Sequence, residues 1–302
     1  MKALDLLLLQ KADNYMTLKK KKIGLIIGSG DLAVHCLEEL VLFGHEITVL
    51  RLPCSKLKLK KNINCIDIIY EEISSALTLL KHNNIIDIAL IGYMERPEID
   101  ICKVSQESKK ILFKVLPALN RGDGAIFTAV KEMLIGEKFN LLKVQDLLPE
   151  LTLPSGRYGS FFEEKDLRNE IKAGISMFLS YAKLDVGQSL IFQRGHCLGM
   201  ETITGTDEMI KAVVNFRKRN YAKDLKSFCG GILIKGPKPM QDLDIDTPVI
   251  GPNTIKLANK AKLTGLVVES NKVILVNRDL IIKLLKSYNM FLLSTNFISK
   301  DF

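Results

Sequence analysis

The sequence predicts an α/β protein of two domains, the first built on a parallel sheet and the second a mixed α+β domain. Two observations support this expectation. From residue 23 onward, short apolar runs alternate with helical patterns, as in a Rossmann-like sheet whose strands are joined by crossover helices. At residues 148–156, two prolines and a glycine interrupt this alternation, and 302 residues suffice for two separate cores.

The first domain is expected to span residues 23–150. Its predicted elements, in chain order, are a strand at Ile23–Gly28, a helix at Leu32–Phe43, a strand at Glu46–Leu50, a helix at Ser74–His82 and a strand at Ile85–Ile91. Gly44 follows the first helix at the position that tolerates a positive φ. Residues 103–135 are expected to be helical, and Leu141–Val144 is expected to form a last strand.

The second domain is expected to span residues 151–302. Glu163–Tyr181 has the pattern of a long amphipathic helix. Gly187–Gln193 and Cys197–Thr202 are expected to form a hairpin that turns near Arg194-Gly195, and Gly231–Ile234 is an apolar strand. These patterns do not identify a known topology for this domain.

The net charge of +9 is concentrated in one part of the chain. Residues 1–22 hold six Lys and two Asp, a net +4, and are expected to form a basic N-terminal extension. The remaining sequence is only mildly basic, and no helix shows a Lys/Arg stripe interleaved with stacking aromatic residues. Nucleic acid is therefore not an expected partner.

The apolar runs and the cysteines indicate the compartment. No apolar run approaches the roughly 20 residues needed to cross a bilayer, and the N-terminus lacks the features of a signal peptide. Six cysteines are scattered without a C-x-x-C pair, which is typical of reduced thiols. We therefore expect a cytoplasmic protein. The sequence leaves its oligomeric state open, a homodimer included.

A glycine-rich turn follows the first predicted strand. Gly28-Ser29-Gly30 with Ala33 fits the G-x-G-x-x-G/A pattern, whose backbone amides and helix dipole favour a phosphate. An NAD site would need an acidic residue at the end of the second strand, and that strand ends at Arg51. NAD is therefore disfavoured, and a tight packing turn without a ligand remains the alternative.

Two further polar positions follow predicted elements of the first domain. Arg96 lies just past the strand Ile85–Ile91, where open α/β sheets bind ligands, and could clamp a phosphate or be an ordinary surface residue. Asp123 lies in a Gly-rich segment before a helix and is either a helix cap or a ligand contact.

Lysine and leucine alternate at Ser55–Lys61, which in extended form would place a basic face opposite an apolar one. An exposed edge or loop is the usual cause of such a pattern. Contact with a membrane surface is the alternative, and it gains weight if the substrate is a lipid.

The densest constellation of polar residues spans Lys235–Thr254. Asp242, Asp244 and Asp246 would share one side of an extended segment. Because like charges repel unless a cation relieves them, this cluster favours Mg²⁺ or Mn²⁺ held by oxygen ligands, with a solvated acidic loop as the alternative. Lys235 and Lys238 are near enough in sequence to neutralise a phosphate beside such a metal.

A second group of polar residues surrounds a predicted helix start. Glu201 ends a strand, and Thr206 and Asp207 begin the next helix, where either would cap the helix and could also contact a ligand. The four histidines are dispersed, and no H-E-x-x-H or P-loop motif is present. Histidine-based metal sites and Ser-His-Asp chemistry have little support.

Taken together, these segments resemble the Mg²⁺-dependent UDP-2,3-diacylglucosamine pyrophosphatases of lipid A biosynthesis. The resemblance runs from about Lys22 to the C-terminus and rests on the following residues: Ile23–Gly30, Gly92–Pro97, Leu184–Gln188, Glu201 with Gly205–Asp207, and Lys235–Thr254. It implies a Rossmann-like nucleotide-binding domain and a C-terminal domain, peculiar to the family, that carries catalysis and the lipid substrate, with the lipid-nucleotide held between the two. The reaction that it implies is hydrolysis to UMP and 2,3-diacylglucosamine 1-phosphate. The resemblance also implies a location at the inner face of the inner membrane.

The resemblance assigns roles residue by residue. The family segment K-x-x-K-P-x-Q-D-x-R-x-D-x-P falls on Lys235–Pro248, which implies metal-binding or catalytic roles for Asp242 and Asp246. We also expect catalytic roles for Lys235 and Lys238, which can offset phosphate charge. With Asp123 added from its position before a helix, the expected substrate-binding residues are Gly28, Ser29, Gly30, Arg96, Asp123, Gln188, Glu201, Thr206, Asp207, Gln241 and Thr254. Two positions depart from the family, because Asp244 replaces the usual Arg and Ala33 replaces the usual Pro.

Our hypothesis is a divalent ion on Asp242 and Asp246 that polarises the pyrophosphate, with water as the nucleophile and Lys235, Lys238 and Arg96 offsetting phosphate charge. One alternative is a non-catalytic protein that binds or senses the lipid-nucleotide, which the Asp244 departure makes plausible. A second is an NADP-linked reductase that uses the glycine-rich turn and Arg51.

Overall fold

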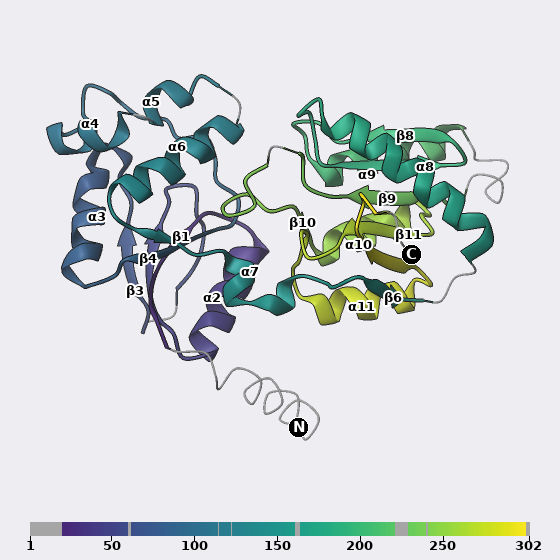
Figure 1. Cartoon of the computed structure of the whole chain (residues 1–302), viewed down its shortest axis with the longest axis horizontal. Helices are drawn as coiled ribbons and strands as arrows, with labels where there is room; N and C mark the ends of the chain where they lie inside the picture. Colours follow the sequence, from purple (N-terminus) through teal and green to yellow (C-terminus); the bar gives the residue numbers. More distant parts are fainter. Residues whose placement is uncertain are drawn as a thin grey trace. The chain divides into compact units, whose positions relative to one another are not determined.

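The structure is a computed structural model that describes residues 20–59, 62–113, 115–121, 123–160, 164–220, 229–239 and 241–299. Most of the predicted N-terminal extension lies outside these ranges. The chain divides into two compact units (Figure 1). The division lies between Leu148 and Pro149. This division falls inside the proline-rich stretch at residues 148–156. Each unit has its own sheet and is considered separately.

The first unit contains a five-stranded sheet in which all neighbouring strands are parallel. The strand order is β3-β2-β1-β4-β5, with bounds β1 Lys22–Ile27, β2 Glu46–Arg51, β3 Asn64–Asp67, β4 Asp87–Ile91 and β5 Asn140–Leu141. The order reverses direction at β1 and β4, which is where ligands bind in open α/β sheets. The predicted Rossmann-like parallel sheet is confirmed.

The helices that connect these strands form where the hydrophobic period predicts them. Helix α2 (Asp31–Leu42) buries residues three or four apart on one face, among them Ala33, Leu37 and Leu40. Gly44 follows this helix with a φ of +80°, as predicted. Helix α3 spans Ile73–His82, after the short 3-10 turn η1 at Tyr70–Glu72.

The later part of this unit is helical, as predicted. The described part of residues 103–135 contains α4 (Gln106–Leu112), α5 (Val115–Ala118) and α6 (Asp123–Gly136). Ser105 begins α4 because its hydroxyl accepts a hydrogen bond from the Ser108 amide. The expected strand at Leu141–Val144 is shorter, since β5 ends at Leu141 and helix α7 covers Val144–Leu147.

The second unit contains a six-stranded mixed sheet, as the mixed α+β prediction requires. The order is β6-β13-β11-β9-β7-β8, with bounds β6 Gly156–Gly159, β13 Phe291–Thr295, β11 Gly265–Glu269, β9 Ile232–Lys235, β7 Ser189–Gln193 and β8 His196–Met200. Strands β9, β11 and β13 are parallel, whereas β6 and β7 pair antiparallel at either side of them. A short parallel pair joins β10 (Val249–Ile250) to β12 (Ile274–Leu275). A 3-10 turn, η2, spans Pro149–Leu151.

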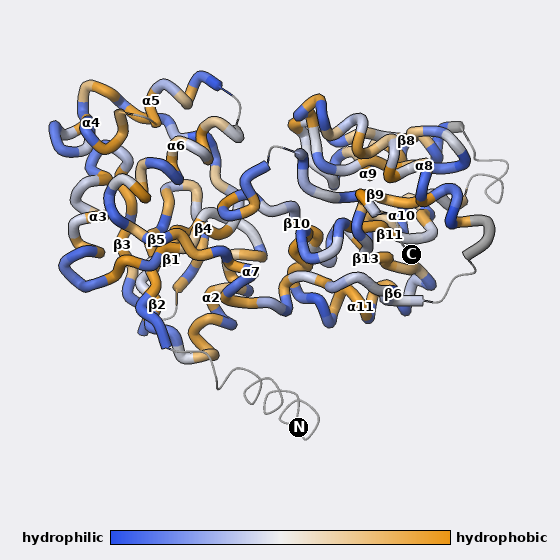
Figure 2. Tube along the Cα trace, viewed as in Figure 1, coloured by the Kyte–Doolittle hydropathy of each residue, from blue (hydrophilic) through white to orange (hydrophobic). Residues whose placement is uncertain are grey.

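Helices cover both faces of this sheet. Helix α8 (Glu164–Ala182) packs on one face, and α9 (Thr206–Asn220), α10 (Pro252–Lys260) and α11 (Arg278–Ser287) pack on the other. Side chains along a strand alternate between faces. On β9, Ile232 and Ile234 join the α8 core, whereas Leu233 joins the α9 side. The apolar strands of both sheets are visible in Figure 2.

The predicted hairpin is confirmed. Strands β7 and β8 pair antiparallel around Arg194 and Gly195, whose φ angles are +47° and +81°. Two successive positive φ values are characteristic of the type I′ turn, whose twist matches that of the flanking strands. The hairpin aligns the start of β7 with the residues that follow β8.

Within the described residues, no helix is long and apolar enough to cross a membrane.

Candidate active site

The candidate site of the second unit is centred on Lys235, the last residue of β9. It pairs with Ser189 of β7 on one side and with Val268 of β11 on the other. Because Leu233 faces α9 and residues two apart on a strand share a face, Lys235 lies on the α9 side of the sheet. Only 3% of the residue is exposed, which is unusual for lysine and requires polar partners.

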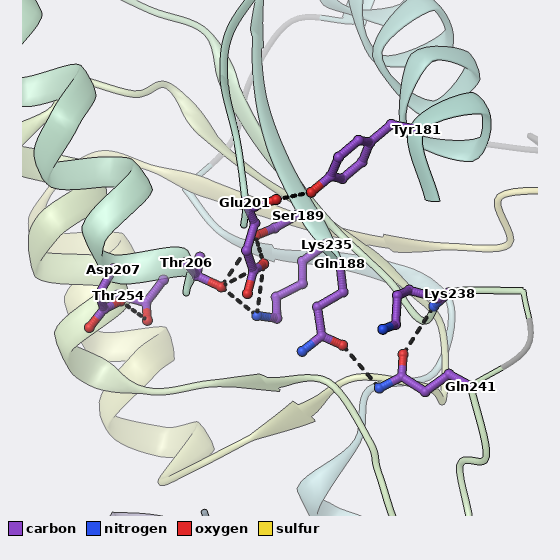
Figure 3. A network of polar contacts seen from close by, with 10 residues as sticks. All are labelled: Tyr181, Gln188, Ser189, Glu201, Thr206, Asp207, Lys235, Lys238, Gln241 and Thr254. Atoms are coloured by element: carbon purple, nitrogen blue, oxygen red, sulfur yellow. Dashed lines mark hydrogen bonds and ion pairs between the residues drawn. The ribbon is translucent and has the colours of Figure 1, made fainter. Parts of the chain in front are cut away.

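These partners form one hydrogen-bonded network (Figure 3). The Lys235 Nζ donates to Thr206 Oγ1 at 2.6 Å and lies 3.8 Å from Glu201 Oε2. Thr206 Oγ1 donates to the same Glu201 oxygen at 3.0 Å, and the Ser189 hydroxyl donates to it as well. A buried ammonium therefore lies beside a buried carboxylate, and the Thr206 hydroxyl bridges the two.

The charge state of Lys235 reflects two opposing effects. Burial lowers the pKa of Lys235, while the carboxylates of Glu201, Asp207 and Asp246 act in the opposite direction. Burial is the larger effect, so the pKa lies below the usual range of lysine. The three carboxylates thus favour the ammonium form that a phosphate group requires.

A tyrosine fixes the backbone next to Glu201. The Tyr181 hydroxyl donates to the main-chain oxygen of Glu201 (Figure 3). Burial, assisted by the nearby Glu201 charge, raises the pKa of Tyr181 to about 12, so this hydroxyl remains a donor near neutral pH. Gly187 fits between the two residues, because a Cβ at this position would collide with the Tyr181 hydroxyl and the Glu201 carbonyl.

Asp207 joins the starts of two helices. It lies in the first turn of α9, and its carboxylate accepts hydrogen bonds from Asn253 Nδ2 at 2.6 Å and Thr254 Oγ1 at 2.9 Å. Both donors belong to the first turn of α10. A carboxylate here is favourable because helix N-termini carry partial positive charge. The structure thus places the predicted residues Thr206, Asp207 and Thr254 around two adjacent helix starts.

Gln241 organises the segment after β9. Its Oε1 accepts from the Lys238 amide at 3.0 Å, and its Nε2 donates to Gln188 Oε1 at 3.1 Å and to Asp246 Oδ2 at 2.8 Å. The side chain of Lys238 forms an ion pair with Asp185, at 2.6 Å between Nζ and Oδ1. The structure therefore brings the predicted residues Gln188, Lys238, Gln241 and Asp246 into one polar group.

The expectation that three aspartates share one side of an extended segment is wrong. The Asp246 amide donates to the Asp242 carbonyl at 2.9 Å, and the Asp244 amide donates to Asp242 Oδ1 at 3.0 Å, so the chain makes a helix-like turn. Residues four apart share a side of such a turn, whereas residues two apart do not. The backbone therefore places residues 242 and 246 on one side of the turn and residue 244 on another.

Asp242 and Asp246 fit one mode of magnesium binding. Among the described residues, no group of three or more His, Cys, Asp or Glu side chains is arranged to hold a metal ion. A cage made only of such side chains is thus absent from that part of the chain. Mg²⁺, however, usually binds through one or two carboxylates together with waters and substrate phosphates. Two carboxylates on one side of a turn match that requirement.

The glycine-rich turn of the first unit is held by β-bridge contacts. The amides and carbonyls of Ser29 and Tyr93 exchange hydrogen bonds of 2.8 and 2.7 Å, and the Gly28 amide donates to Ile91. Gly30 has a φ of +103° and precedes α2. The turn therefore lies at the carboxyl ends of β1 and β4, as predicted, but the Ser29 amide already has a partner within the protein.

The other predicted residues of the first unit have structural partners. Arg96 donates from its two terminal nitrogens to the carbonyls of Leu119 and Arg121, at 3.0 Å each, and so holds the turn after α5. Asp123 begins α6, and its side chain lies outside the described residues. Arg51 makes a bidentate pair with Asp67, at 2.6 and 3.0 Å. This pair places a carboxylate where the NADP-linked alternative needs a free cation for the 2′-phosphate.

The close approach at the glycine-rich turn gives a testable prediction. A Cβ at Gly28 would collide with the Tyr93 carbonyl, and backbone atoms cannot move aside cheaply. Gly28→Ala is therefore expected to lower the free energy of unfolding by about 1–3 kcal/mol, measured by urea denaturation. Gly136→Ala in α6 is the matched control, because nothing lies within 4 Å of the place that its methyl group would take. Equal stability of the two variants would contradict the proposed crowding.

Several residues of the site were not predicted from the sequence. Ser189 lies in an apolar strand and Tyr181 lies at the end of an amphipathic helix, so both have the pattern of core residues. Asn253 and Asp185 were also missed. The signal that could have identified Ser189 is its position opposite Lys235 in the neighbouring strand. That signal can be used only when the pairing of the two strands is known.

Comparisons with known proteins cover nearly the whole chain. Residues 22–151 match the LpxI N-terminal domain and residues 154–293 match the LpxI C-terminal domain. The chain is 26% identical over 276 residues to the UDP-2,3-diacylglucosamine pyrophosphatase LpxI of Caulobacter vibrioides. This alignment covers 91% of the present chain and 98% of the relative.

Among solved structures, the Bordetella bronchiseptica enzyme WbmH in complex with NAD⁺ shows a weak similarity. It is 12% identical, with a TM-score of 0.23, over 39% of this chain and 38% of that one. A score this low supports no conclusion about fold or ligand.

Proposed function

This chain belongs to the LpxI family, and on that premise we propose that it is a UDP-2,3-diacylglucosamine pyrophosphatase of lipid A biosynthesis. The reaction is hydrolysis of the phosphoric anhydride. The oxygen of water forms a bond to one phosphorus, the bridging P–O bond breaks, and the products are UMP and 2,3-diacylglucosamine 1-phosphate. The family match at both domains is the observation that carries this proposal.

The geometry of the second unit supports the proposal. A diphosphate is a dense anion, and hydrolysis concentrates further charge on the leaving phosphate. Lys235 offers a buried ammonium, and the attraction between a buried cation and an anion is stronger than in bulk water. Lys238, whose side chain is 23% exposed, offers a second cation that must exchange its partner Asp185 for the substrate.

We propose that Asp242 and Asp246 bind the Mg²⁺ or Mn²⁺ that the reaction uses. When bound, such an ion neutralises phosphate charge and makes a water molecule more acidic. The chain's own contribution is the turn that keeps both carboxylates on one side. Gln241 adds to it, because its amide donates to Asp246 and restrains that side chain.

The location of the enzyme is also a proposal. We place it in the cytoplasm, at the inner face of the inner membrane, because the substrate carries two acyl chains. In the described part of Ser55–Lys61, Lys56 and Lys58 are exposed, while Leu57 and Leu59 are half-buried. This is the alternation expected if a basic face lies opposite an apolar one. Basic residues of this kind are attracted to anionic lipid surfaces.

The decisive experiment is a turnover assay. Purified protein with UDP-2,3-diacylglucosamine and Mg²⁺ is expected to release UMP, and excess EDTA is expected to abolish release until Mg²⁺ is added back. The physical reason is that two lysines alone leave the attacking water unactivated. Binding of the lipid-nucleotide without release of UMP would favour the non-catalytic alternative. Undiminished release in EDTA would reject the metal proposal but not the hydrolase.

A further inference from the structure

Ser189 carries a buried hydroxyl in the candidate site, beside the residues proposed to take part in the reaction. It begins β7, is fully buried, and pairs in register with Lys235 of β9. Its neighbour two residues along, Ile191, packs on the α9 side of the sheet, so Ser189 faces that side too. A fully buried serine needs a hydrogen-bond partner, and its choice of partner is informative.

That partner is the Glu201 carboxylate. The Ser189 hydroxyl donates to Glu201 Oε2, which also accepts from Thr206 Oγ1 at 3.0 Å. The hydroxyls of Ser189 and Thr206 are themselves 3.2 Å apart. Two hydroxyl protons therefore converge on one carboxylate oxygen (Figure 3). Such charge-assisted bonds hold a carboxylate more firmly than neutral hydrogen bonds would.

We propose that Ser189 is a positioning residue for the reaction: by fixing Glu201 against Thr206, it holds the Lys235 ammonium where a phosphate is bound. The inference rests on the proposed hydrolase function. Ser189 acts through Glu201 and Thr206, and Lys235 is the group that meets the substrate. Thr206 completes the chain of contacts, because it accepts from Lys235 at 2.6 Å and donates to Glu201.

The electrostatic surroundings of Lys235 determine what loss of Ser189 would do. Within the part of the chain that the structure describes, the charged groups that act on Lys235 are carboxylates, namely Glu201 after β8, Asp207 at the start of α9 and Asp246 in the turn after β9. Glu201 is the strongest of these influences, and burial opposes it. If the Glu201 side chain could move away, its charge would no longer counteract burial, and the pKa of Lys235 would fall further. The ammonium would then be lost at a lower pH.

The experiment compares Ser189→Ala with wild-type enzyme. We expect kcat to fall roughly 10- to 100-fold, the scale of a misplaced catalytic group, while KM changes little. We also expect the alkaline limb of the pH–rate profile to move to lower pH. A purely structural serine would leave that limb in place.

Ser294→Ala is the matched control. Ser294 lies on β13 of the same sheet, is 1% exposed and donates to the Leu153 carbonyl at 3.0 Å, so its removal costs a comparable buried hydrogen bond. It should keep kcat and the alkaline limb of the wild type. A second pair protects against misfolding of the first variant: Thr206→Val should shift the limb as Ser189→Ala does, and Thr206→Ser should restore it.

The outcomes separate the two proposals. If wild-type protein releases UMP and Ser189→Ala behaves like Ser294→Ala, the positioning role is rejected and the hydrolase stands. The same holds if kcat falls but the alkaline limb does not move. If wild-type protein releases no UMP, the hydrolase proposal fails, and the role of Ser189 fails with it. Should Ser189→Ala not fold, an unshifted limb in Thr206→Val rejects the inference.

Discussion

Lys235→Met is expected to lower kcat/KM at least about 100- to 1000-fold, because it removes a preorganised cation from a site shielded from water. Methionine retains most of the aliphatic volume, so the packing of β9 against β7 and β11 is largely preserved. The loss should therefore appear in turnover measured by UMP release. Activity within a few-fold of the wild type would remove Lys235 from the mechanism.

The same substitution should also destabilise the protein. It leaves the Glu201 carboxylate buried without its ammonium partner, and breaking a buried pair in this way costs about 3–5 kcal/mol. The double variant Lys235→Met with Glu201→Gln removes both charges and should recover much of that stability. It should not recover activity. Parallel recovery of both would mean that the lysine serves only the fold.

Asp246→Ala and Asp242→Ala form the second large prediction. Each should lose most turnover, about 100-fold or more, while the urea midpoint changes little, because both side chains lie on a partly exposed turn and not in the core. Asp244→Ala is the control on the same turn, since residue 244 does not share the side of the other two. Turnover is measured across a Mg²⁺ titration.

The titration distinguishes a metal ligand from a general loss of structure. A lost ligand should raise the Mg²⁺ concentration needed for half-maximal rate in Asp242→Ala and Asp246→Ala, and leave that concentration unchanged in Asp244→Ala. If all three variants respond alike, the loss reflects the charge of the turn as a whole. A variant at full rate would exclude that aspartate from the mechanism.

The sequence predicted those helices and strands in which apolar residues recur at a regular helical or strand spacing. Strand β1, helix α2 and the β7–β8 hairpin were placed to within one or two residues, since strand and helix periods and the Arg194-Gly195 turn are local properties. Strand β3 was missed because its side chains are mostly exposed and carry no apolar alternation. The end of α5 depends on the turn at residues 119–121, which Arg96 holds and which a helical pattern in the sequence conceals.

The site was predicted in composition but not in geometry. Lys235, Glu201 and Thr206 were each named from the sequence, yet their contact arises only because β9 lies beside β7 and α9 begins after β8. Ser189 was invisible because a serine inside an apolar strand has no local pattern that marks it. The aspartate turn was misjudged because an alternation of charges looks the same in a strand and in a turn until its hydrogen bonds are known.

The bridge that Asp207 builds between α9 and α10 has a consequence for competition by cellular anions. An internal negative charge already satisfies the positive ends of both helices. Free orthophosphate therefore gains little by binding at these helix ends, and selectivity depends on groups that only a larger ligand can contact together. An enzyme that releases phosphomonoesters would therefore be inhibited less by small anions that compete for its site.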